Sequence, residues 1–84
     1  MITAKEAREL CYFNAKVVTP FTARWVNPIW RNGKLVDDVR ERAFSEGETV
    51  YCNEWRPEGM NVKGECDKYP MFVGFEHFDC LELA

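Results

Sequence analysis

Several patterns are missing from this chain of 84 residues, and each absence excludes a class of function. There is no Cys-x-x-Cys pair, no Gly-x-Ser-x-Gly sequence, and no glycine-rich loop of the kind that holds phosphate groups. Apolar runs last only a few residues, far fewer than the roughly 20 needed to cross a bilayer. The charged start, with Lys5 and Glu6, contains no apolar signal-peptide segment. We therefore expect a cytoplasmic protein that is not an enzyme and that uses no cofactor.

Residues able to bind a metal or act as nucleophiles are few and scattered. They are Cys11, Cys52, Cys66, Cys80 and the single histidine, His77. His77 and Cys80 have the two-residue gap that zinc sites use, but a structural site normally draws on two such close pairs. A zinc site therefore remains an alternative to the favoured interpretation, in which reduced cysteines act as small apolar side chains.

The composition indicates one globular domain spanning residues 1–84, with 46% hydrophobic and 14% aromatic residues around one small core. The net charge of −3 is unevenly distributed. Residues 16–42 carry six basic side chains against three acidic ones, whereas residues 43–84 carry nine acidic side chains against three basic ones. Such a dipolar surface steers association with charged partners, although ordinary solvated charge is the alternative.

The strongest local signal is the pair Asn32-Gly33 between apolar-rich flanks. Asn-Gly is the preferred loop of a two-residue hairpin, because both central residues need positive φ. The sequence therefore predicts a strand from Phe21 to Arg31 and a return strand that starts at Lys34. Pro28 has no N–H group, which suits an edge strand or a bulge.

The remaining chain predicts an α+β fold, with an N-terminal amphipathic helix packed on a small, mostly antiparallel β-sheet. Thr3 and Glu6 form a capping box, and helical spacing of apolar residues continues from there to about residue 15. Its expected inner face consists of Ala7, Leu10, Cys11 and Phe13. Short strands are expected at residues 16–19, 49–55, 71–75 and 80–83, and a loop at 56–64. Residues 37–44 fit both a helix and a strand, and a short helix is favoured.

Tryptophan stands beside arginine three times in this small domain. Both residue types dominate binding hot spots in protein interfaces, and both also stack on single-stranded nucleic acid. The candidate partner-binding residues are Arg24, Trp30, Arg31, Lys34, Trp55 and Arg56. The alternative is that each pair is simply one buried tryptophan beside one exposed arginine, because strand neighbours face opposite sides. An acidic pI of about 5.1 favours a protein partner over nucleic acid.

A second candidate surface is acidic. It consists of Glu46, Glu48, Glu54, Glu58, Glu65 and Asp67. Carboxylates gathered on one surface can stand in for phosphates, so this surface would face a basic partner that handles nucleic acid.

The opening residues, Met1-Ile2-Thr3-Ala4-Lys5-Glu6-Ala7-Arg8-Glu9-Leu10, resemble the starts of small bacteriophage-encoded accessory proteins. The resemblance covers these ten residues and carries no functional residues over. It implies a protein of the infected bacterium's cytoplasm that inhibits a host macromolecular machine by protein contact, as anti-CRISPR and other anti-defence proteins do. The expected partner is a host protein or a protein–nucleic acid complex, with no membrane. A homodimer through an exposed strand edge is a further alternative.

Overall fold

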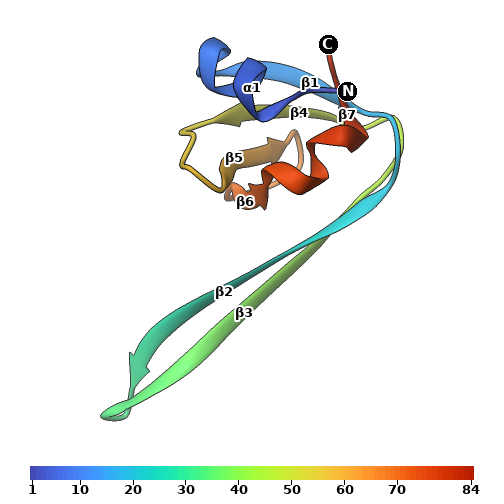
Figure 1. The fold of residues 1–84 in the computed structure, drawn as a ribbon. Helices are drawn as coiled ribbons and strands as arrows, with labels where there is room; N and C mark the ends of the chain where they lie inside the picture. The colour runs from blue at the N-terminus through green and yellow to red at the C-terminus, as the bar shows by residue number, and fades with distance from the viewer.

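A five-stranded antiparallel sheet and a separate two-stranded sheet make up most of this computed structural model, which describes residues 1–84 (Figure 1). The elements in chain order are α1 (Ala4–Leu10), β1 (Phe13–Val17), β2 (Phe21–Arg31), β3 (Lys34–Phe44), β4 (Thr49–Asn53), β5 (Gly59–Gly64), β6 (Met71–Gly74), the 3-10 helix η1 (Phe75–Cys80) and β7 (Leu81–Leu83). The large sheet has the strand order β6-β5-β4-β1-β7. We call it, with α1 and η1, the body, and we call β2 and β3 the arm.

The arm is a long hairpin whose strands pair with each other along their whole length, from Phe21 opposite Phe44 to Arg31 opposite Lys34. Asn32 and Gly33 have φ values of 53° and 74°, so the predicted two-residue hairpin loop is confirmed. Eleven residues in each strand give a length of about 35 Å. Figure 1 shows the arm running away from the body and from both chain termini, which explains the elongated dimensions of 44 × 24 × 19 Å.

The hydrophobic core belongs to the body. Its largest fully buried side chains include Phe44, Phe78, Ile2, Met60 and Leu81. The arm supplies only Ala23 and Phe44 to this core, and both lie at the arm's base. Residues 25–40 therefore contribute no side chain to the buried core.

The N-terminal helix is shorter than predicted. The capping box of Thr3 and Glu6 is present, but α1 ends at Leu10, and Cys11 has a positive φ of 66°. The chain then turns into β1, where alternate residues from Phe13 to Val17 are buried between β4 and β7. Of the expected inner face, Ala7 is buried in the helix, whereas Leu10 and Cys11 are exposed. Pairing in the sheet thus overrides the helical spacing after residue 10.

The favoured short helix at residues 37–44 is wrong, because this segment is the second half of β3. In a strand, Asp37 and Glu41 share one face, which is unfavourable only where that face is buried. The arm has no inner face at these positions: both side chains are exposed. The acids therefore cost nothing in a strand, and pairing with β2 decides the conformation.

The predicted loop at residues 56–64 is also wrong in its second half. Gly59–Gly64 forms β5, a central strand between β4 and β6. Glycine is needed at its first position, because a Cβ atom on Gly59 would overlap the backbone carbonyl of Val73. The expected strands at 49–55, 71–75 and 80–83 are present with slightly shorter bounds. The strand expected at 16–19 begins earlier and ends earlier, as β1.

None of the helices is both long and apolar enough to span a bilayer.

Candidate partner-binding arm

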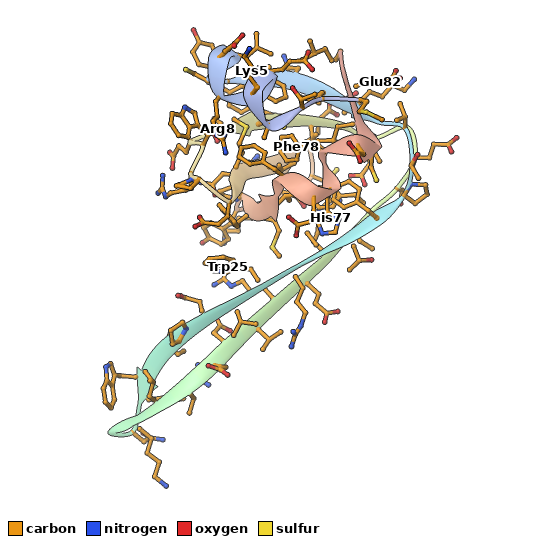
Figure 2. The ribbon with its side chains drawn as sticks, viewed as in Figure 1. Lys5, Arg8, Trp25, His77, Phe78 and Glu82 are labelled. Atoms are coloured by element: carbon orange, nitrogen blue, oxygen red, sulfur yellow. The ribbon has the colours of Figure 1, made fainter.

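Aromatic stacking holds the base of the arm on the body. The Phe21 ring lies 4.7 Å from the ring of Phe44 and 5.1 Å from that of His77 in η1. One step further out, Trp25 packs on Phe72 of β6 at 4.8 Å. Figure 2 shows Trp25 and His77 on the side of the body from which the arm leaves. These contacts fix the direction of the arm near its base.

An ion-pair network also ties the base of β3 to the body. The Arg42 guanidinium donates to Glu48 at 2.8 and 3.0 Å and to Asp67 at 2.9 and 3.2 Å. Glu48 also accepts from the Ser45 backbone N–H at 2.7 Å, and Asp67 from that of Gly64. Arg42 stacks 4.0 Å above the ring of Phe44. One cation thus joins the arm to two loops of the body.

This network changes the protonation of both acids. Hydrogen bonds from Arg42 hold the pKa of Glu48 below its ordinary value of 4.5. Partial burial raises the pKa of Asp67, but hydrogen bonds from Arg42 and the Gly64 amide outweigh it, so the net shift is below the ordinary 3.8. The same contacts raise the pKa of Arg42, which stays charged throughout.

Stability should therefore fall in acid. Both carboxyl groups have lower pKa values when folded than when unfolded, so their contribution is complete above about pH 6 and is lost as the pH falls through the folded values. We expect the free energy of unfolding, measured by urea titration, to be level from pH 7 to 6 and to decrease below about pH 5. Arg42→Met should flatten this decrease; an equally steep decrease in that variant would contradict the assignment.

Beyond its base the arm has two faces, because side chains alternate along each strand. Register pairs Trp30 with Leu35 and Val26 with Val39, which places all four on one face. Trp30 is 75% exposed and Leu35 60% exposed, and both valines are exposed as well. We call Val26, Trp30, Leu35 and Val39 the apolar face. The pair Pro28 and Asp37 lies between them on the same face, and exposed apolar side chains on one face are typical of interaction surfaces.

The predicted partner-binding residues do not form one cluster. Arg24 shares the apolar face's side of the hairpin and lies 3.5 Å from Glu41, whereas Arg31 and Lys34 point to the opposite side at the tip. Trp55 and Arg56 are exposed in the loop that follows β4, on the body.

The predicted acidic surface is divided in a similar way. Glu48 and Asp67 are half-buried and engaged with Arg42. The other four are exposed and belong to three loops: Glu46 lies between β3 and β4, Glu54 and Glu58 between β4 and β5, and Glu65 between β5 and β6. Two of the six charges are therefore structural.

Sequence reasoning missed Val26, Leu35 and Val39. They are spread over two strands in the sequence, and they share a face with Trp30 only in the hairpin register. Asn32-Gly33 fixes that register. Pairing the residues of the two strands outward from this loop would have identified Val26, Leu35 and Val39 as neighbours on the face of Trp30.

The cysteines and the histidine remain apart. All four thiols are free, and no group of three or more His, Cys, Asp or Glu side chains is arranged to hold a metal ion. Cys52 is fully buried, and burial raises the pKa of its thiol to about 12, so it stays protonated and unreactive near pH 7.

Comparisons with known proteins add no family to this picture. No family model matches the sequence, and no curated protein or solved structure is significantly similar to it. The structure therefore defines the class only as a small β-rich domain with a short helix and a projecting hairpin arm.

Proposed function

We propose that this protein binds another protein through its arm and thereby modulates that partner, without catalysing a reaction. The observation that supports this most strongly is the apolar face, with Trp30 and Leu35 exposed near the arm's tip. Beyond its base, the arm contributes no side chain to the buried core. Its length and composition are therefore not explained by core formation. Tryptophan at such a position is a typical binding hot spot.

Charge on the arm favours a protein over nucleic acid. The arm carries five cations, but Arg24, Arg40 and Arg42 are each paired with an acidic side chain. Only Arg31 and Lys34 have no acidic partner. Nucleic-acid binding relies on several cations that neutralise phosphates, and two are few for that purpose.

The resemblance of the first ten residues to bacteriophage accessory proteins supports a more specific proposal. The partner would be a component of a bacterial host's machinery, met in the cytoplasm, and binding would inhibit it as anti-defence proteins do. In this proposal α1 covers the body's core with the fully buried Ala7 and does not contact the partner.

Capture from a bacterial lysate tests this proposal. Both termini lie far from the arm's tip, so the protein can be immobilised through either one with the arm free (Figure 1). The matched variant replaces residues 26–39 by Asn-Gly, which joins Trp25 to Arg40, a pair equivalent in the ladder to Arg31 and Lys34.

We expect the intact protein to retain a specific host protein, with or without nuclease, and the shortened variant to lose it. Retention by both forms would place binding on the body and contradict the proposal. Retention that disappears with nuclease would identify nucleic acid as the ligand instead.

A further inference from the structure

The arm's two outer edges differ, and only one is open along its length. In a hairpin with a two-residue loop, the pair flanking the loop is hydrogen-bonded and the pairs then alternate. Counting from Arg31 and Lys34, the backbone groups of every second residue point outward: those of Trp30, Pro28, Val26 and Arg24 on β2, and those of Leu35, Asp37, Val39 and Glu41 on β3.

Pro28 closes the β2 edge. It lies in the middle of the strand at an outward position, where it has no N–H group to offer. Near the base, β2 also lies close to β6 of the body. The outward N–H groups of β3 from Leu35 to Glu41 have no backbone partner elsewhere in the chain. The outward N–H groups of Arg24, Val26 and Trp30 on β2 also have none, but the row is unbroken only on β3, so the β3 edge is the one open along its length.

A pocket lies where this open edge meets the body. It is lined by four consecutive β3 residues, Val39 to Arg42, and by Asp67, Tyr69, Pro70 and Met71. Consecutive strand residues face opposite sides, so a pocket lined by all four lies along the strand's edge and not on one face. A chain laid against β3 would thus run from the tip toward a concave surface on the body.

A second copy of the protein is a poor occupant of this edge. Antiparallel pairing of β3 with its own copy about a two-fold axis puts like charges opposite each other in every register that pairs most of the strand. Depending on the register, Asp37 faces Asp37 or Glu41, Asp38 faces Asp38, Glu41 faces Glu41, or Arg40 faces Arg40. Like charges directly opposite each other are destabilising in a sheet.

We propose that the open edge of β3, from Leu35 to Glu41, binds an extended basic and apolar segment of a partner protein as an added antiparallel strand. This proposal deepens the proposed function, on which it rests. Main-chain hydrogen bonds to the outward groups supply affinity, and side chains opposite β3 supply specificity. The segment carries cations opposite Asp37, which has no cationic partner in the arm, and opposite Asp38 and Glu41, whose ion pairs are exposed. It carries apolar residues opposite Leu35, Val36 and Val39.

This pairing defines a probe. The peptide Lys-Glu-Val-Lys-Lys-Val-Ile, read from its N-terminus, lies opposite Glu41 to Leu35 in antiparallel register. Its matched control, Glu-Lys-Val-Glu-Glu-Val-Ile, has the same apolar residues with every charge reversed. We expect the first peptide to bind the full-length protein at least about tenfold more tightly, because several cross-strand charge pairs change from attractive to repulsive.

Amide hydrogen exchange of the full-length protein locates the bound strand. With peptide at about ten times its dissociation constant, exchange of the outward amides of Leu35, Asp37, Val39 and Glu41 should slow about tenfold. The outward amides of Val26 and Trp30 on β2 should be unchanged. Protection on β2, equal binding of both peptides, or no binding of the first peptide would each overturn the proposal.

A pair of proline variants provides the second test. Val26 and Val39 are directly opposite each other, both exposed and both outward-pointing. Val39→Pro removes one N–H from the β3 edge, and Val26→Pro removes the equivalent group from the edge that Pro28 already interrupts. We expect a loss of at least about tenfold in peptide affinity for Val39→Pro and a loss of no more than about threefold for Val26→Pro, which shares the apolar face but offers no group to the β3 edge. Equal losses in two folded variants would contradict edge binding.

The outcomes separate this inference from the proposed function. If shortening the arm abolishes partner capture but the β3 amides stay unprotected by peptide, the arm binds by another surface, and only the strand-addition proposal fails. If the shortened variant still captures the partner, the proposed function itself fails, whatever the peptide does.

Discussion

Replacing Arg42 by methionine is expected to lower the free energy of unfolding by about 2–3 kcal/mol. The substitution removes five hydrogen bonds, four to the two acids and one to the Ala43 carbonyl, and leaves Glu48 and Asp67 half-buried without their cation. Complete burial of such a network would make the loss larger, but the three side chains keep 22–30% of their surface exposed. Methionine keeps apolar contact with Phe44, so the measured loss reports the charge network.

Arg24→Met is the matched control. Arg24 also pairs with an acid across the same hairpin, but both side chains are 61% exposed. Exposed pairs contribute little, so we expect a loss of no more than about 0.5 kcal/mol in the same urea titration. Equal losses in the two variants would show that the network at the base is no more important than a surface ion pair.

The second large effect is expected in binding. The double variant Trp30→Ala, Leu35→Ala removes the two most exposed residues of the apolar face, and we expect partner affinity to fall at least about 100-fold. Neither side chain belongs to the core, so the free energy of unfolding should change by less than about 0.5 kcal/mol. Titration of immobilised protein with the captured partner measures the first quantity, and urea unfolding the second.

A control with the same chemistry is present on the body. Leu10 and Tyr12 are exposed at the end of α1, so Leu10→Ala, Tyr12→Ala also removes one leucine and one aromatic ring from the surface. Partner affinity should be unchanged in this variant. If it fell as much as in the arm variant, general loss of apolar surface would explain both results, and the arm would have no special role.

Local signals in the sequence predicted the turn well and the lengths of the elements less well. A two-residue hairpin loop needs positive φ at both of its residues, and Asn-Gly adopts these values readily. The pair Asn32-Gly33 therefore predicted the hairpin directly. The helix beyond Leu10 and the segment 37–44 depended on partners distant in the sequence. Burial of alternate β1 residues and pairing with β2 decided them, and neither is visible in a local window.

The candidate surface shows the same division. Trp30 was identified from its residue type, but the apolar residues around it became a surface only once the register joined β2 to β3. From the sequence, Arg42 was one of six basic side chains in residues 16–42 and lay toward the end of the helix favoured at 37–44. Its two acidic partners, Glu48 and Asp67, lie in separate loops, and only the fold brings them to one guanidinium.

Photo-crosslinking from the arm tests the central claim, that the arm contacts the partner, most directly. Benzoylphenylalanine placed at Trp30 or, as the control, at Tyr12 substitutes one exposed aromatic residue for another, on the arm or on the body. In a bacterial lysate we predict one dominant protein adduct from position 30 and none of that mass from position 12. The same adduct from position 12 but not from position 30 would contradict the account.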